Sequence, residues 1–249
     1  MFGLENLSSI ILSTLAVLII LPIHELAHGF AAYKLGDPTA KNLGRLTLNP
    51  IKHLDIFGTL SLILFHFGWA KPVPVNVRNL RKPRRDFAIV ALAGPLTNLT
   101  LSFFTVPLWL ALRNFYISTY TPDAFLTTFF LTALDFVGVF HSINLGLAIF
   151  NLIPVPPLDG SRILTALLPP KATLWLARNE RNIYIGLLIW LFAGDIVARA
   201  LLSVPIVASS SVLSFIAGLF SLSDLLAGLN MLISDLMFSL WELIPAFRI

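Results

Sequence analysis

The chain has 249 residues, of which 57% are hydrophobic and only 12% are charged, and its mean hydropathy is +0.85. This composition excludes an ordinary water-soluble globular domain and predicts a protein that crosses a membrane several times. The net charge of +4 does not indicate a nucleic-acid partner, because in a membrane protein the distribution of Lys and Arg is what carries information.

The first predicted span is the uncharged segment 6–23, which leads directly into His24. About 20 apolar residues suffice for a helix to cross the hydrocarbon core. We expect this helix to continue to about Lys34 and to end at Gly36, because Pro38 prevents its extension. No basic region precedes the segment and a polar motif follows it, so it is not expected to be a removable signal peptide.

Residues 38–86 are predicted to be a loop with some internal structure. The apolar stretch 57–69 is too short to cross a membrane as a helix. Residues that favour β-structure around 59–65 and 73–77 predict short strands or a re-entrant hairpin. Such backbone is tolerated at membrane depth only where protein covers it.

Three further spans are predicted in the middle of the chain, at Phe87 to Leu112, Ala124 to Asn151 and Ile183 to Leu202. The last of them contains two charged residues, Asp195 and Arg199. Because they are four residues apart, they can form an ion pair on one helical face and need not lie alone in lipid.

The C-terminal part is predicted to form a fifth span at 205–223 and a sixth helix at 224–243. The sixth carries three acidic residues between leucines at helical spacing, so that it either spans the membrane or lies in its interface. The predicted fold is an all-α polytopic membrane protein of about six helices, with a small β-hairpin or re-entrant region between the first two. We expect one membrane-embedded domain over 1–249, with a catalytic core at about 8–165 and C-terminal helices at about 182–245.

Orientation follows from the basic residues. Ten of them lie in 34–85 and four in 160–182, but none lies in 114–123. The two basic loops are therefore predicted to be cytoplasmic. A site near His24 would then lie toward the cytoplasmic side of the membrane.

His24, Glu25 and His28 form the pattern HExxH. On a helix the two histidines project from one face about one turn apart, as two ligands of one metal ion must. Cysteine is absent, which leaves His, Asp and Glu as possible ligands. Three ionisable residues in an apolar helix are costly unless they bind something, so we interpret them as a metal site rather than as histidines satisfied at a helix end. Glu25 could take a proton from a metal-activated water.

A catalytic zinc ion needs a third protein ligand. Asp159 is the candidate, because it lies in NLIPVPPLDG at 151–160, where three prolines prevent a regular helix and broken backbone can line a cavity. An aspartate that caps the next helix is the alternative. His53, His66 and His141 have no ligand spacing, and we interpret them as solvated or hydrogen-bonded residues.

Several segments resemble the site-2 protease family of intramembrane zinc metalloproteases. They are HELAHG at 24–29 and NLIPVPPLDG at 151–160. GWAKPVPVN at 68–76 and ALAGPLTN at 91–98 are similar to segments of the compact prokaryotic branch, so the resemblance covers about residues 10–165. It implies a multi-pass protein of a prokaryotic cell membrane. We expect neither an inserted PDZ domain nor an appended CBS pair, because the loops and the end of the sequence leave no room for them.

The resemblance implies that His24, His28 and Asp159 bind one Zn²⁺ per chain and that Glu25 is the general base. It also implies a role for Asn151, which could donate a hydrogen bond to the oxyanion of the tetrahedral intermediate or position the substrate. Its alternative role is to satisfy carbonyl groups at a helix end.

The predicted function is hydrolysis of peptide bonds in or near transmembrane segments of membrane-protein substrates. Residues 57–77 are hypothesised to hold the extended substrate by β-addition. Asn98 is a secondary candidate that could form a hydrogen bond across helices or face the cavity. The main rival is a metal transporter or metal sensor, which would tolerate Glu25→Gln. A zinc protease with a distal glutamate ligand, and non-haem iron at the same residues, fit less well.

Overall fold

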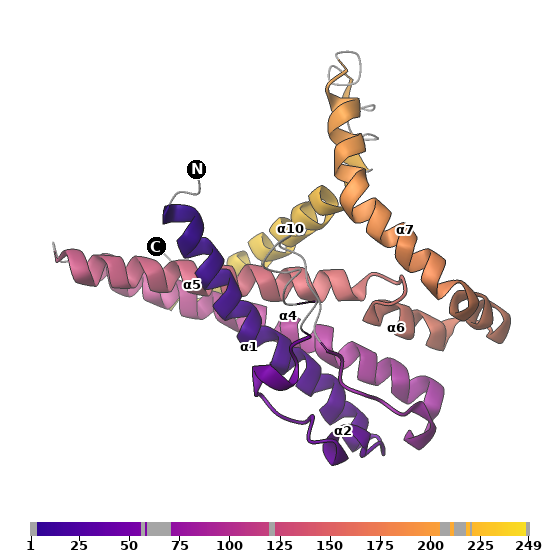
Figure 1. The fold of residues 1–249 in the computed structure, drawn as a ribbon. Helices are drawn as coiled ribbons and strands as arrows, with labels where there is room; N and C mark the ends of the chain where they lie inside the picture. Colours follow the sequence, from indigo (N-terminus) through magenta and orange to yellow (C-terminus); the bar gives the residue numbers. More distant parts are fainter. Residues whose placement is uncertain are drawn as a thin grey trace.

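The computed structural model describes residues 4–55, 58, 71–119, 123–204, 210–211, 218–219 and 221–247. Long helices account for most of this part of the chain, and no strand occurs in it (Figure 1). The helices are α1 (Leu4–Lys34), α2 (Thr39–Asn42), α4 (Pro83–Ser118), α5 (Ala124–Leu152), α6 (Asp159–Leu167), α7 (Pro170–Leu202) and α10 (Leu222–Glu242). Three short 3₁₀ helices complete the described elements: η1 (Pro50–Lys52), η2 (Val77–Asn79) and η3 (Pro245–Phe247).

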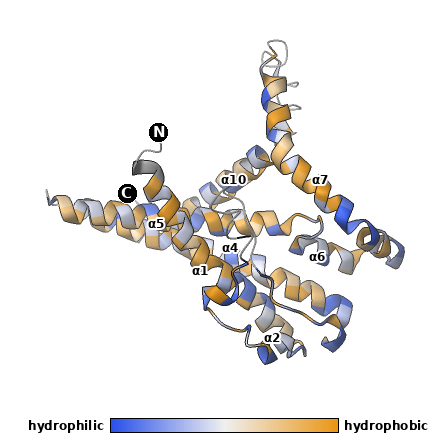
Figure 2. Cartoon of the chain, viewed as in Figure 1, coloured by the Kyte–Doolittle hydropathy of each residue, from blue (hydrophilic) through white to orange (hydrophobic). Residues whose placement is uncertain are grey.

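Five helices of the described chain are long and apolar enough to cross a membrane: α1, α4, α5, α7 and α10. Their most apolar windows have mean hydropathies between 1.2 and 2.2. Figure 2 shows the apolar residues along these helices and the polar ones gathered around α2 and the start of α7. The prediction of an all-α polytopic membrane protein is confirmed.

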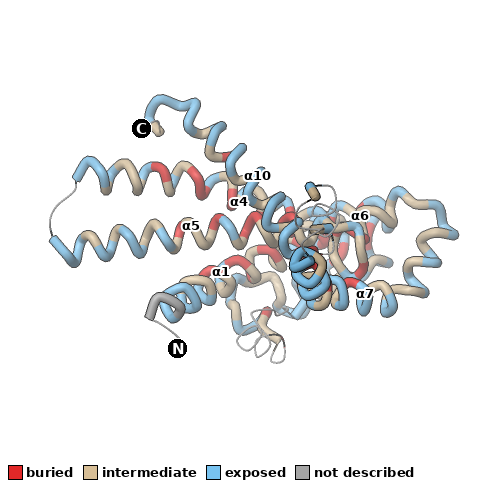
Figure 3. The backbone as a smooth tube through the Cα atoms, turned by 90° about the horizontal axis from the view of Figure 1, so that it is seen from above, coloured by how far each residue is buried: buried red, intermediate tan, exposed pale blue. Residues whose placement is uncertain are grey.

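A bundle of α1, α4 and α5 forms the centre of the molecule. Helix α4 packs against α1, α5 and α6, and buried residues gather where the long helices meet (Figure 3). α10 contacts the α4–α5 pair through a buried apolar cluster of Val106, Leu110, Leu145, Ile149 and Met237. Side chains in such a cluster gain dispersion contacts that lipid tails alone do not provide at the same density.

Helix α7 extends away from the bundle (Figure 1). A row of its large apolar side chains is exposed, including Ile185, Ile189, Phe192 and Ile196. In water such a row would be unfavourable, whereas in a membrane it faces hydrocarbon at no cost. The exposure of α7 is therefore what a membrane helix requires.

The end of α1 lies where the sequence predicts it. Gly36 follows the helix with φ of +114°, a left-handed conformation that side chains rarely adopt. A Cβ atom there would also lie 3.0 Å from the carbonyl oxygen of Asn79, so the next segment of the chain passes close by.

The predicted strands are not supported. Residues 59–65 lie outside the described part of the chain, while 73–76 have no regular secondary structure and Val77 begins η2. The reason is local, because Pro72 and Pro74 have no backbone N–H to donate to a strand ladder.

The helices after the third span are longer than predicted. Residues 160–182, expected to be a loop, belong mostly to α6 and α7, because prolines at the first turn of a helix are well tolerated and Pro170 starts α7. The predicted fifth span, 205–223, lies mostly outside the described residues. The sixth predicted helix corresponds to α10 and is long and apolar enough to span.

The predicted ion pair between Asp195 and Arg199 is wrong. The Asp195 carboxylate instead accepts hydrogen bonds of 2.7 Å from the hydroxyl groups of Ser221 and Ser223. No ion pair between Asp195 and Arg199 occurs in the described chain. The polar groups at the start of α10 therefore satisfy the carboxylate and fasten α10 to α7.

Candidate metal centre

His24 and His28 lie on one face of α1 and are buried, with exposed fractions of 4% and 8%. Their Nε2 atoms are 3.0 Å apart. The rings meet edge to face with centroids 4.6 Å apart. The helix therefore brings two imidazoles together in the way that the four-residue spacing predicts.

Asp159, distant in sequence, completes this cluster. Its Oδ2 lies 3.4 Å from Nε2 of His24 and 3.2 Å from Nε2 of His28. Asp159 is the first residue of α6, and the N-cap position belongs to Leu158. The carboxylate therefore points toward the histidines and does not cap its own helix, which was the alternative reading.

The chain between α5 and α6 folds back tightly to place Asp159. Helix α5 ends at Leu152, and the prolines that follow it cannot continue a helix. Gly160 is essential to the turn, because a Cβ atom there would collide with the carbonyl oxygens of Leu152 and Ile153. The first turn of α6 is thus packed directly on the last turn of α5.

The three ligand atoms fit a small cation. They lie within 4.8 Å of one another, and Oδ2 of Asp159 is buried without a hydrogen-bond partner among the described residues. Burial raises the pKa of the Asp159 carboxyl, but the two imidazoles outweigh it and lower that pKa to about 2. The carboxylate is therefore ionised, as a metal ligand must be. Two imidazoles and one carboxylate are a ligand set that zinc accepts.

Helix α4 supplies the space for this cluster. A Cβ atom at Gly94 would collide with Nε2 of His28 and lie 2.6 Å from Cε1 of His24. Only glycine lets the backbone of α4 approach both rings so closely. Sequence patterns did not predict this role of Gly94, although its position four residues before Asn98 was a usable signal.

The second nitrogen of each ring is also held by α4. Nδ1 of His28 lies 2.7 Å from the carbonyl oxygen of Val90. Nδ1 of His24 lies 3.1 Å from the amide nitrogen of Asn98. The expectation that Asn98 forms a hydrogen bond across helices is thus met, and its partner is one of the candidate ligands.

Glu25 is fixed by the segment that precedes η2. Its Oε2 accepts a 2.7 Å hydrogen bond from the backbone N–H of Val73. This segment, residues 71–76, is itself held down by Arg45, which donates to the carbonyl oxygens of Lys71 and Pro72 at 2.8 and 3.2 Å.

The other candidates are not joined to this cluster by any hydrogen bond of the described residues. The amide of Asn151 donates to the carbonyl of Leu147 within α5, at 3.0 Å. His53 bonds to the carbonyl of Thr47, and His141 to Ser102 and Ser234. Both histidines are therefore hydrogen-bonded structural residues, as interpreted, while His66 lies outside the described residues.

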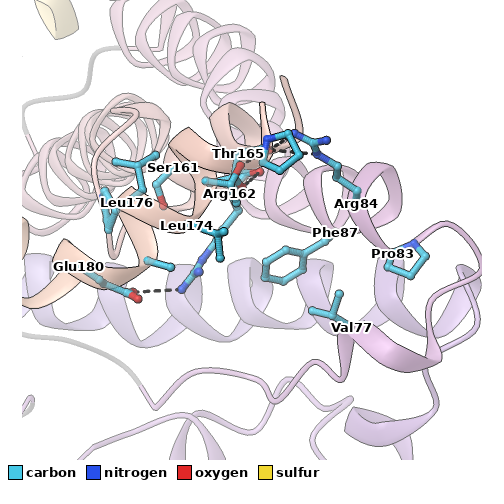
Figure 4. A pocket seen from close by; sticks show the side chains of 14 residues that line it. Val77, Pro83, Arg84, Phe87, Ser161, Arg162, Thr165, Leu174, Leu176 and Glu180 are labelled. Atoms are coloured by element: carbon cyan, nitrogen blue, oxygen red, sulfur yellow. Dashed lines mark hydrogen bonds and ion pairs between the residues drawn. The ribbon is translucent and has the colours of Figure 1, made fainter. Parts of the chain in front are cut away.

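A separate cavity of about 520 Å³ lies between α4, α6 and the first turns of α7 (Figure 4). An ion pair of 3.3 Å between Arg162 and Glu180 crosses it, and Arg84 donates to the carbonyl of Thr165 at its edge. None of the metal-ligand candidates lines this cavity. It is therefore distinct from the cluster at Asp159, although α6 borders both.

Comparisons with known proteins agree with this geometry. Residues 12–194 match the family model of peptidase family M50. The chain is 44% identical over 168 residues to a Bacillus subtilis protein named "Putative zinc metalloprotease YwhC", which covers 67% of this chain and 74% of that protein.

More distant relatives carry names of the same kind. The Rip2 protein of Mycolicibacterium smegmatis is 31% identical over 159 residues, which cover 62% of this chain and 56% of that protein. The MJ0611 protein of Methanocaldococcus jannaschii is 31% identical over 110 residues, or 44% of this chain and 49% of that protein. No solved structure matches the chain at a comparable level.

Proposed function

The chain belongs to peptidase family M50, the site-2 proteases, and from that membership we propose that it cleaves membrane-protein substrates in or near their transmembrane segments. It is a zinc metalloendopeptidase with several membrane-embedded helices. The observation that carries the finer proposal is the convergence of three ligand atoms, two from α1 and one from the distant α6, beside a glutamate.

In the proposed site, His24, His28 and Asp159 hold one Zn²⁺. The zinc ion, when bound, supplies a Lewis acid that lowers the pKa of water and polarises the scissile carbonyl group. Glu25 takes the proton from the attacking water and passes it to the leaving amine. We further propose that Asn151 donates to the oxyanion with the amide hydrogen that is not bonded to the Leu147 carbonyl.

The substrate segment must be extended before it can react, because a helix buries its own peptide bonds behind side chains and hydrogen bonds. The β-addition hypothesis for 57–77 loses support in its described part. In 71–76, two residues are prolines, and the N–H groups of Lys71, Val73 and Asn76 already donate within the protein. Few donors remain there for pairing with a substrate strand.

We propose that the site faces the cytoplasmic side. The basic residues concentrate in 34–85, which joins the end of α1 to the start of α4, and in 160–182, which follows Asp159 through α6 into α7. We also propose that residues 1–249 form a single membrane-embedded domain.

The test combines zinc content with cleavage. Wild type purified in detergent should contain one zinc ion per chain, and Asp159→Ala should lose it. Asp135→Ala is a matched control, because this exposed carboxylate lies outside the cluster. Retention of zinc by Asp159→Ala would remove Asp159 from the site.

Glu25→Gln separates hydrolysis from simple metal binding. It should keep its zinc but cleave a reconstituted transmembrane substrate about 10²- to 10⁴-fold more slowly, because it has lost the general base. Unchanged cleavage would contradict the proposed role of Glu25. A metal transporter or sensor, by contrast, would keep its function in this variant.

A further inference from the structure

Three positions of α4 face the histidines in register. Val90, Gly94 and Asn98 are spaced four residues apart, so they lie along one face of the helix. Val90 bonds to His28, Gly94 leaves room for both rings, and Asn98 bonds to His24. Each candidate ligand on α1 is therefore oriented by its own residue on α4.

The partner of His28 determines the tautomer of that ring. The carbonyl oxygen of Val90 can only accept a hydrogen bond, so Nδ1 of His28 must carry the proton. The lone pair then lies on Nε2, the atom that faces Asp159 at 3.2 Å. This is the neutral tautomer that a ligand binding through Nε2 needs.

His24 has the same requirement but a different partner. Its Nε2 also faces Asp159, at 3.4 Å, so its Nδ1 must carry a proton when Nε2 binds a metal ion. The group beside Nδ1 is the Asn98 amide, at 3.1 Å from its nitrogen. An NH₂ group in that place would donate to Nδ1 and leave the proton on Nε2, which prevents ligation.

The amide of Asn98 contains the acceptor that His24 needs. Asn98 is fully buried, and its Oδ1 has no hydrogen-bond partner among the described residues. A rotation of 180° about the last side-chain bond exchanges Oδ1 and Nδ2 without moving the rest of the residue. Such a rotation gives the buried oxygen a donor and gives His24 the required tautomer.

We propose that Asn98 is a positioning residue of the metal centre: with zinc bound, its Oδ1 accepts the Nδ1–H of His24. The inference rests on the proposed zinc site. Asn98 contacts neither zinc nor substrate, and it acts through His24 by fixing both the ring orientation and the tautomer.

The experiment measures zinc affinity by competition with a chelator, on full-length protein in detergent. Asn98→Leu keeps a similar volume but removes the acceptor, and zinc binding should weaken about 10- to 100-fold, as is typical when an outer partner of a ligating histidine is lost. Asn98→Asp should bind zinc as tightly as wild type or more tightly, because a carboxylate can only accept from Nδ1–H.

Asn144→Leu is the matched control. Asn144 is also a fully buried amide in the bundle, but it donates to the carbonyl of Phe140 within α5 and has no hydrogen bond to a histidine among the described residues. This variant should keep the zinc affinity of wild type. If Asn98→Leu does not fold, as judged by circular dichroism and gel filtration, Asn98→Ala takes its place.

Two results would overturn the inference. If Asn98→Asp loses zinc as severely as Asn98→Leu, the amide acts as a donor, and if Asn98→Leu binds zinc like wild type, Asn98 has only a packing role. The measurement needs no substrate. A wild-type protein that binds zinc but cleaves nothing would therefore contradict the protease proposal without affecting this one, whereas a wild type without zinc would contradict both.

Discussion

The backbone N–H of Val73 donates a 2.7 Å hydrogen bond to the carboxylate of Glu25, across 48 positions of the sequence. Val73 is buried, and it lies between Pro72 and Pro74 in a segment that Arg45 and Asp37 hold at either end. One carboxylate oxygen of Glu25 is thereby fixed. The orientation of the proposed general base is set by a loop and not by its own helix.

We predict that Val73→Pro lowers peptide cleavage but leaves zinc content unchanged. Proline removes the N–H and is compatible with the extended conformation that a residue before Pro74 prefers. A hydrogen bond to a charged group contributes about 1.5–3 kcal/mol, so a misplaced base should reduce kcat about ten- to a hundredfold. Steady-state cleavage and elemental analysis measure the two quantities.

Two variants control for effects of Val73→Pro other than the loss of its N–H group. Val73→Ala retains the N–H and should keep most of the activity. Val75→Pro introduces proline two residues later, where the N–H has no hydrogen bond in the described chain. If Val75→Pro impaired cleavage as much as Val73→Pro, stiffening of the loop and not the hydrogen bond would be responsible.

Gly94→Ala is predicted to weaken zinc binding at the metal centre. The added Cβ collides with Nε2 of His28 and lies 2.6 Å from a ring carbon of His24, so at least one imidazole must move. We expect zinc affinity to fall about tenfold or more and cleavage to fall with it. Chelator competition and cleavage assays provide the measurements.

Gly186→Ala is the matched change for that experiment. Its Cβ would meet nothing within 4 Å, and alanine in a helix is favoured over glycine by roughly 0.5–1 kcal/mol. This variant should be as active as wild type. Normal zinc binding by Gly94→Ala would contradict the prediction, because it would mean that α4 can move away from the histidines.

We predict that Asp37 makes the stability of the protein depend on pH, because it binds the loop that contains Asn76 and Asn79. Its buried carboxylate accepts hydrogen bonds from the backbone of Asn76 at 2.6 Å and from the side chain of Asn79 at 2.9 Å, and Thr39 donates further bonds. Burial raises the pKa of Asp37, but these hydrogen bonds outweigh it and hold that pKa below its ordinary value of 3.8.

Because the folded pKa is the lower one, this carboxylate contributes its full stabilisation above about pH 4 and loses it as pH falls through the folded pKa. Asp37→Asn should lower stability at pH 7 by about 2 kcal/mol, since hydrogen bonds to a charged group are lost. Thermal unfolding in detergent from pH 3 to pH 7 measures this. The difference between wild type and variant should shrink at the acid end, and a constant difference would contradict the prediction.

Sequence patterns predicted the site residues that can be recognised from local spacing or local composition. The spacing of His24 and His28 requires only one helix, and Asp159 was found because a proline-rich break in an apolar chain is unusual. Gly94 and Val73 were missed because their roles depend on which helix and which loop lie against α1. Single-sequence periodicity contains no information on such packing.

The two predictions that were wrong, the ion pair of Asp195 and the loop at 160–182, also relied on local sequence features alone. The ion pair of Asp195 with Arg199 was predicted from helical spacing alone, whereas the serines at the start of α10 were closer partners. The basic residues of 160–182 suggested a loop, but charged side chains can lie on helix ends that project beyond the membrane. Helix α7 is long enough for this, with 33 residues, or about 50 Å at about 1.5 Å per residue.

The orientation of the protein can be tested by cysteine labelling, because the chain contains no cysteine of its own. Helix α4 has 36 residues, about 54 Å at about 1.5 Å per residue, so it is long enough for both of its ends to extend beyond a hydrocarbon core of about 30 Å. Ser118→Cys, at its exposed C-terminal end, should react with an impermeant maleimide in right-side-out vesicles. Arg78→Cys and Arg178→Cys, both exposed on the basic side, should react only in inverted vesicles. The opposite pattern would place the metal centre near the outer surface, and the positive-inside argument would then fail for this protein.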